Sequence, residues 1–503
     1  MNKLAYLLAI VAALFSIFPL TDTDIWWHLA CAREWVTTWT PVRTPVVNVH
    51  EYFQQVVGFV YDLGGAPLLV AFKAILWGFV FFLFSGSLPR TCSGGIASHN
   101  VAWQSLVPIV LLFVFRYHFE IRPVLFSLLF LGIYWNVLPC IFENRHCEPH
   151  RGVAISRCSV IVLILAIQWL WCRCQGLYIL GPLFALLLLL AKIWSSRKIG
   201  EKLSPKAATG LVAFEFALFA MPFLHREGLN LFLYPFGLLD RLLGLSSSAA
   251  VFASEIAENR SPITLLLAGE NVLESTLMIL LCVTGIVWCI RSFFEKGSIG
   301  DDASSRSLLG IQNIVLLVTA ILALVAERNF VLFLPVLLGV NNLHFSFKHL
   351  NVKFYQLSSI LVIALLMGFW VRSLSAYDSS MVAYQRVPVD AARWMLDHPH
   401  PGRLFNDDRA GGYLAFVNPA DSVYIDGRFI LKTADFFERY LEYAKNPTLF
   451  IADADSLNID RAVFPLRYYA RWGILLQALE KEKKWHRSYQ DDYFVLFDRD
   501  FTR

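Results

Sequence analysis

Residues 3–30 read KLAYLLAIVAALFSIFPLTDTDIWWHLA, an apolar run that ends in a cluster of acidic, aromatic and histidine side chains. The run from Leu4 to Leu20 is long enough to cross a bilayer core of about 30 Å with help from the interfaces. Lys3 precedes it, and the small-residue pattern of a signal-peptide cleavage site is missing, so we interpret it as a first transmembrane helix. The acidic cluster should then lie at a membrane surface.

The composition of the whole chain is that of a membrane protein with one polar domain. Of its 503 residues, 57% are hydrophobic and 16% are charged, whereas soluble chains carry about 25% charge. Residues 376–503 hold 36 of the 82 charged side chains. We therefore expect a lipid-embedded domain at 1–375 and an extracytoplasmic domain at 376–503, which excludes a soluble, fibrous or disordered protein.

Apolar runs of spanning length recur through the first 375 residues and predict about eleven transmembrane helices. They lie at 4–20, 66–88, 102–115, 124–142, 158–172, 177–191, 207–222, 273–289, 308–325, 330–344 and 356–374. The count is open by two between 158 and 191, where two short runs are separated by four residues. Two longer segments between spans, 21–65 and 223–272, are predicted on the outer side.

The distribution of basic residues indicates the orientation. With a cytoplasmic N-terminus, the inner loops carry 15 Lys and Arg residues and the outer loops carry nine, all of them arginine. Such an excess is typical of the cytoplasmic side. The C-terminal domain, with 17 basic and 19 acidic residues, offers no basic face for nucleic acid. We expect a multi-pass protein in the lipid bilayer whose chemistry faces outward.

The polar tail reads as short strands alternating with helices, which predicts a small α/β domain. Helices are expected near 390–397, 434–445 and 468–483, strands at 403–406, 422–426 and 461–465, and a hairpin at 488–497. Asn406, Asp407 and Asp426 close the first two strands, so we expect them to face one binding site. Ordinary turn chemistry is the alternative.

The first outer segment holds the strongest candidates for chemistry. Asp22 and Asp24 could hold a divalent cation against a phosphate, or one of them could act as a general base. His28 follows them closely, and His50 and Glu51 lie further along the same segment. The structural alternative is a juxtamembrane helix capped by one of the acids, with its tryptophans in the interfacial belt.

Three charged residues beside apolar runs are further candidates, because charge at a membrane edge is costly. Arg122 and Arg328 are both predicted at the outer face, where the planar guanidinium would suit a phosphate group. Glu120 lies close to Arg122. The alternative for the arginines is that they only extend their side chains to the interface.

Seven stretches together resemble a group of bacterial multi-pass proteins similar to the GT-C glycosyltransferases. They are DTDIWWHLACAREW (22–35), VNVHEYFQQVV (47–57), RYHFEIRPVLFSLL (116–129), ASEIAENRSPI (253–263), AERNFVLFLPVLL (326–338), RLFNDDRAGGYLAF (403–416) and DSVYIDGRF (421–429). The resemblance implies a bacterial inner-membrane enzyme that uses a polyprenyl-phosphate-linked sugar and a catalytic acid in the first outer loop, the position of Asp22 and Asp24. Residues 405–413 are also loosely similar to the WWDYG acceptor-binding region of oligosaccharyltransferases.

The favoured hypothesis is a GT-C-like glycosyltransferase that moves a sugar from a polyprenyl phosphate to a lipid, glycan or protein acceptor. Asp24 would be the base or a ligand of Mg²⁺ or Mn²⁺, with Asp22 as its partner, and Arg122 and Arg328 would bind the phosphate. His28, His50, Glu51, Asn406, Asp407 and Asp426 would contact substrate. The alternatives are a non-catalytic lipid-glycan carrier or assembly protein and, less favoured, an ion-coupled transporter, for which Glu215 is the clear acid within a span.

A topology reporter tests the orientation. Because the basic residues favour a cytoplasmic N-terminus and the span count is odd, a reporter that is active only in the cytoplasm should be silent when fused after Arg503. A strong signal from that fusion would contradict both the span count and the outward position of the site.

Overall fold

The structure of the chain is a computed structural model. It describes residues 3–35, 38–43, 46–86, 101–142, 157–199, 204–243, 247–294, 303–340, 352–467 and 470–500. The predicted basic inner loops lie largely outside these ranges, and so do the ends of the runs predicted at 66–88 and 330–344. The described part is mostly helical, with one small sheet near the C-terminus.

Each of the eleven predicted spans coincides with a helix. These helices are α1 (Lys3–Phe15), α3 (Glu51–Gly86), α4 (Val101–Val114), α5 (Pro123–Val137) with the short α6 (Pro139–Phe142), α7 (Arg157–Trp171), α8 (Leu180–Ile199), α9 (Pro205–Ala220), α13 (Val272–Phe294), α14 (Ala303–Val325), α15 (Phe330–Val340) and α16 (Val352–Leu374). Within the described ranges, six segments are long and apolar enough to cross a membrane: 51–86, 123–142, 176–194, 205–224, 272–294 and 357–374. Eleven crossings stay a prediction.

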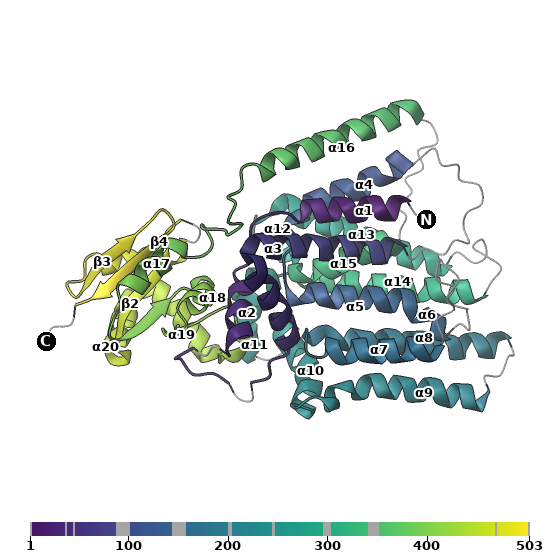
Figure 1. Cartoon of the computed structure of the whole chain (residues 1–503), viewed down its shortest axis with the longest axis horizontal. Coiled ribbons are helices and arrows are strands. Elements are labelled where there is room, and N and C mark those ends of the chain that lie inside the picture. Colours follow the sequence, from purple (N-terminus) through teal and green to yellow (C-terminus); the bar gives the residue numbers. More distant parts are fainter. Residues whose placement is uncertain are drawn as a thin grey trace.

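The helices form one bundle whose two ends differ. Figure 1 shows most of them running side by side, with the N-terminus at the end of the bundle farther from the sheet-containing domain. Many of their outward side chains are apolar and exposed, among them Phe216, Trp194 and Leu273. Exposed apolar surface on long helices is what a lipid environment requires.

The two outer segments are themselves helical. Segment 21–65 contains α2 (Asp24–Arg33) and the first half of α3, which bends at Gly64 and Gly65 before Pro67. Gly65 has a φ of +65°, a value that favours glycine, and Pro67 lacks the N–H for a helix bond. Segment 223–272 contains α10 (Leu229–Leu243), α11 (Ser247–Glu255) and α12 (Pro262–Leu267). Helices therefore make up much of both segments.

The C-terminal domain is built on a four-stranded mixed sheet. β1 (Arg403–Asn406) runs parallel to β2 (Ile459–Pro465), and β4 (Phe494–Arg499) pairs antiparallel with both β2 and β3 (Trp485–Gln490), giving the order β1-β2-β4-β3. The accompanying helices are α17 (Val389–Asp397), α18 (Asp408–Val417), α19 (Ala434–Lys445), α20 (Pro447–Leu457) and α21 (Gly473–Leu479). Phe405 on β1 packs its ring against Tyr440, Phe450 and Trp472 in the core beneath the sheet.

The strand predicted at 422–426 is wrong. Its backbone is held by side chains and by the first outer segment instead of a neighbouring strand. The Asn406 side chain accepts from the Tyr424 N–H at 2.8 Å and donates to the Ile425 carbonyl at 2.7 Å. The Trp39 N–H donates to the Val423 carbonyl at 3.1 Å. Once these groups are satisfied, the segment needs no strand partner.

The C-terminal domain rests on α2, as Figure 1 shows for α18. The Leu20 N–H donates to the Met381 carbonyl at 2.9 Å, and the ring of Trp26 packs edge-on against Tyr413 at 4.7 Å between centroids. Gly412 on α18 faces the backbone of Trp27, where a Cβ would lie 3.0 Å from the amide nitrogen. The first outer segment therefore packs directly against the tail.

The His400 side chain links three parts of the C-terminal domain through hydrogen bonds. The His400 side chain bonds to Asp460 on β2 at 2.7 Å through Nδ1 and to Asp421 after α18 at 2.9 Å through Nε2. Burial disfavours the charged ring, but the two carboxylates outweigh it and raise the pKa of His400 to about 9.

The charge of His400 should make stability depend on pH. Because its pKa is about 9 in the folded chain and near 6.5 when unfolded, its contribution is complete below pH 6.5 and lost as the pH rises through 9. We expect His400→Gln to lower the free energy of unfolding by roughly 1–3 kcal/mol at pH 6. The deficit should shrink towards pH 10 in melting curves of the full chain in detergent. A deficit that does not change with pH would contradict this assignment.

Candidate functional site

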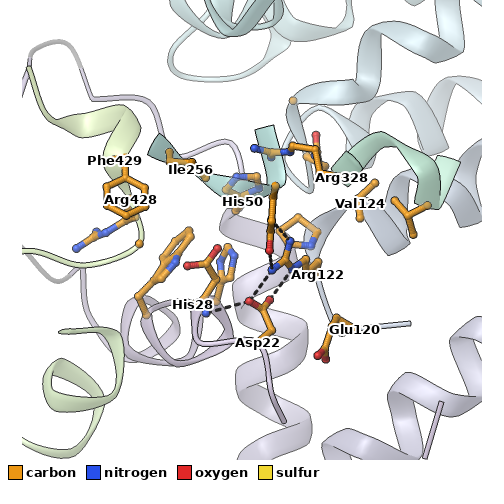
Figure 2. A pocket seen from close by; sticks show the side chains of 18 of the residues that line it. Asp22, His28, His50, Glu120, Arg122, Val124, Ile256, Arg328, Arg428 and Phe429 are labelled. Atoms are coloured by element: carbon orange, nitrogen blue, oxygen red, sulfur yellow. Dashed lines mark hydrogen bonds and ion pairs between the residues drawn. The ribbon is translucent and has the colours of Figure 1, made fainter. Parts of the chain in front are cut away.

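A cavity of about 680 Å³ lies between one end of the helix bundle and the C-terminal domain. Six residues singled out from the sequence line it together, although they come from three separate segments: Asp22, Asp24, His28, His50, Arg122 and Arg328. Glu120 lines it too. Figure 2 shows several of these side chains gathered around one space. The structure thus brings the first-loop acids and the two arginines into a single site.

The acidic motif lies at the N-terminus of α2. The helix begins at Asp24, its N-cap residue is Thr23, and Thr23 makes no side-chain capping bond. Asp22 accepts from the Asp24 N–H at 3.3 Å. An acid in the first turn is favourable for a helix, but both carboxylates also face the cavity, so neither serves α2 alone.

Arg122 links the first acid to a second one that sequence reasoning missed. It donates from Nε and Nη2 to the two oxygens of Asp22, each at 2.9 Å, and from Nη1 and Nη2 to Glu258 at 2.6 and 2.7 Å. The dashed lines in Figure 2 mark the contacts with Asp22. Arg122 precedes Pro123, which holds it in an extended conformation just before α5. Since three of its nitrogens already donate to acids, Arg122 positions these acids rather than presenting a free phosphate clamp.

The pKa values of Glu258 and Asp24 are shifted in opposite directions. Burial opposes ionisation of Glu258, but Arg122 outweighs it and lowers the pKa of Glu258 to about 2. Burial, assisted by the negative charge of Asp22, raises the pKa of Asp24 to about 8. Near neutral pH, Glu258 is therefore ionised and Asp24 is predominantly protonated. Two acids with such different pKa values in one cavity are typical of a functional site.

The two histidines on the cavity wall are neutral near pH 7. Burial lowers the pKa of His50 to about 4, and burial followed by the charge of His50 lowers the pKa of His28 well below its usual value. His50 donates from Nδ1 to the Cys174 carbonyl at 3.2 Å, which leaves its Nε2 as an acceptor. The ring of His28 lies 3.5 Å from that of Trp27, centroid to centroid. These rings can accept hydrogen bonds or pack against a ligand without adding charge.

Arg328 is the arginine best placed for an anion. Its side chain is exposed within the cavity, and Nη1 donates to the Asn259 amide oxygen at 2.8 Å. Asn259 is buried and in turn donates to the Phe252 carbonyl at 3.0 Å. This chain of two bonds orients the guanidinium while other N–H groups can still reach a ligand.

The C-terminal domain supplies part of the wall through Gly427 and Arg428. Arg428 makes three side-chain bonds to Asp426 at 2.5 to 3.0 Å. Its guanidinium lies 5.5 Å from the ring of Trp27 and 5.3 Å from that of Trp35. Arg428 was not predicted, because only the folded tail brings it beside α2; the DSVYIDGRF stretch that contains it was the available signal.

Four predicted substrate contacts lie outside the cavity lining. Glu51 pairs with Arg173 at the start of α3. Asp407 caps α18 by accepting from the Arg409 N–H, and it also accepts from Trp472 at 2.7 Å. The other two are Asn406, which holds the segment at 422–426, and Asp426, which holds Arg428. In this structure all four are engaged by the protein itself, and their substrate role stays a prediction.

Glu120 occupies a separate corner of the cavity. It accepts a hydrogen bond from Thr21, and its second oxygen lies 3.9 Å from the buried Lys73 Nζ. Burial raises the pKa of Glu120, and Lys73 acts against that rise. Glu120 and Lys73 together therefore anchor the beginning of the first outer segment to α3.

The fold of this chain is similar to that of a solved enzyme. No protein-family model and no curated protein sequence matches the chain. A crystal structure of the Archaeoglobus fulgidus oligosaccharyltransferase, tethered with an acceptor peptide containing the NVT sequon, superposes with a TM-score of 0.50. The match covers 99% of this chain and 74% of the other, at 12% sequence identity. The chain is thus a membrane protein with a GT-C-like fold: a helical body with a C-terminal domain at one end of the bundle.

A glycine substitution tests the contact between the tail and the acidic motif. A Cβ at Gly427 would lie 1.9 Å from the Asp24 Oδ1, whereas a Cβ at Gly473 meets nothing within 4 Å. We expect Gly427→Ala to destabilise the full chain by roughly 1–3 kcal/mol, because one side must move. Thermal melting in detergent should show a lower Tm for Gly427→Ala than for the wild type, and almost no change in Tm for Gly473→Ala. Equal melting temperatures for the two variants would mean that the loop does not contact Asp24.

Proposed function

We propose that the chain is a GT-C-like glycosyltransferase that moves a sugar from a polyprenyl phosphate to an acceptor hydroxyl on a lipid, glycan or protein. The observation that carries the proposal is the gathering of Asp24, Asp22, Arg122 and Arg328 around one cavity at the end of an apolar helix bundle. The fold shared with an oligosaccharyltransferase supports this class of reaction. We also propose eleven crossings, from the apolar runs, an extracytoplasmic C-terminal domain, from the basic-residue bias, and a bacterial inner membrane, from the resemblance to bacterial multi-pass proteins.

Asp24 is the proposed general base. A base works best when its pKa lies near the working pH, and the pKa of Asp24, about 8, meets that condition. Asp22 is already paired with Arg122, and its negative charge helps to raise the pKa of Asp24. The neutral rings of His28 and His50 would line the path of the acceptor.

Arg328 is the proposed partner of the donor phosphate. A phosphate group attached to a lipid must lie near the membrane surface. Arg328 lies in the short helical turn directly before α15 and lines the cavity at that end of the bundle. A guanidinium can donate two hydrogen bonds to phosphate oxygens and stabilise the charge that develops as the phosphate leaves. Arg122 supports this indirectly by pairing with Asp22 and Glu258, which reduces the negative charge that the two acids add to the cavity.

The proposed step is a single inverting displacement. The acceptor oxygen forms a bond to the anomeric carbon while the bond from that carbon to the phosphate oxygen breaks. The electron pair leaves with the polyprenyl phosphate, and the acceptor proton passes to the ionised Asp24. A divalent cation in the cavity would supply additional positive charge to the departing phosphate. In this step the side chains of the chain bind the donor, orient the acceptor and take up the acceptor proton.

The proposal is tested by a transfer assay on the full chain in lipid nanodiscs with a panel of polyprenyl-phosphate sugars. Asp24→Asn should lower kcat by at least about a hundredfold, because it removes the base. For the wild type, kcat/KM should rise about tenfold per pH unit below pH 8 and level off above it, since the carboxylate is the active form.

Asp62→Asn is the matched control, because Asp62 is an exposed aspartate on α3 that pairs with Arg33 at 3.3 Å outside the cavity. It should retain full activity and the same pH profile. Full transfer by Asp24→Asn would overturn the base assignment. Binding of polyprenyl phosphate without transfer from any donor sugar would favour the carrier or assembly protein instead.

A further inference from the structure

We propose that a divalent transition-metal cation binds to His118, Glu274 and Glu327, on the wall of the same cavity. Within the described part of the chain, these three side chains form the one group whose metal-ligating atoms all lie within 4.8 Å of one another. His118 Nε2 and Glu274 Oε1 are 2.6 Å apart. The site does not depend on which reaction the cavity performs.

Three separate segments supply the ligands. His118 ends the short helix η3 (Arg116–His118), Glu274 lies in the first turn of α13, and Glu327 begins the short helix η7 (Glu327–Asn329). The Glu327 N–H donates to the Arg260 carbonyl at 3.0 Å, which fixes the backbone at this ligand. His118 and Glu327 both line the cavity, so an ion could enter from it.

The donor set indicates the class of cation. One imidazole nitrogen and two carboxylates give a charge of −2 when the carboxylates are ionised, which balances a divalent ion. Imidazole favours Zn²⁺, Mn²⁺ and similar ions over Mg²⁺, which prefers oxygen ligands throughout. Three protein ligands also leave coordination positions open for water or a substrate oxygen.

The acidic motif of the first loop is less suited to an ion. Both oxygens of Asp22 accept from Arg122, and a cation there would have to displace a guanidinium. Asp24 is buried beside Gly427, and no third carboxylate, cysteine or histidine of the described residues joins the pair in a three-ligand group. We therefore place the cation at the cluster of His118, Glu274 and Glu327, while metal binding by Asp22 and Asp24 stays a prediction from the sequence.

The location gives the cation a role beside Arg328, the residue that follows Glu327. An ion held by Glu327 would place a second positive charge near this guanidinium, and both could share the oxygens of one phosphate. This last point rests on the proposed function, whereas metal binding itself does not. Without a metal, the same side chains would form an ion pair between His118 and Glu274.

Metal-binding measurements on the purified, chelator-treated full chain distinguish a metal-bound cluster from a metal-free ion pair between His118 and Glu274. Mn²⁺ would be titrated and followed by electron paramagnetic resonance, and Zn²⁺ content would be measured by elemental analysis. We expect one ion per chain for the wild type and at least about tenfold weaker binding for His118→Ala, Glu274→Gln and Glu327→Gln. Size-exclusion profiles and Tm values would establish that each variant is folded.

Glu270→Gln is the matched control, because Glu270 lies just before α13 and pairs with Arg260 instead of the cluster. It should bind the ion like the wild type. The proposal is overturned if the wild type binds no ion, if Glu327→Gln and Glu274→Gln retain full affinity, or if Asp22→Asn and Asp24→Asn lose the ion while the cluster variants keep it. Because no transfer assay is used, failure of the proposed reaction leaves this result unaffected.

Discussion

Arg122 joins three parts of the outer surface that are far apart in the sequence. Its guanidinium pairs with Asp22 from the first outer segment and with Glu258 from the segment before α12, while its own backbone leads into α5. Asp22 is buried, so loss of Arg122 would leave its charge uncompensated away from water. The relative positions of these segments, and therefore the cavity between them, depend on this one side chain. The high pKa of Asp24 has its origin in burial within the same group of charges.

The tail domain is a structural part of the cavity. Asp426 fixes the guanidinium of Arg428 near Trp27 and Trp35, so a loop of the tail forms one wall. The opposite wall is formed by bundle segments such as the one carrying Arg328. Figure 2 shows Arg428 and Arg328 on opposite sides of the view. A ligand in this space would contact both the membrane body and the tail.

Patterns of local sequence predicted most of the helices, because apolar runs of spanning length have few alternatives to helix. They also indicated β1, α19 and the closing hairpin. The strand predicted at 422–426 failed because Asn406, distant in sequence, satisfies its backbone, and α18 and α20 were missed because glycine and acidic residues masked their helical pattern. For the site, charged residues at span edges identified Arg122 and Arg328. The sequence could not show that Arg122 pairs with Glu258. Nor could it show that His118 lies beside Glu274 and Glu327, because both contacts depend on how the helices pack.

The close approach of Gly427 to Asp24 has a consequence for how the protein matures. These residues are separated by most of the chain, so during synthesis the acidic motif emerges long before the loop that covers it. Until the tail has folded, Asp24 lacks the burial that raises its pKa and behaves as an ordinary solvated carboxylate. The chain can thus insert all its helices while the cavity is still open to water. Completion of the last domain therefore changes the pKa of a side chain that was made near the beginning of the chain.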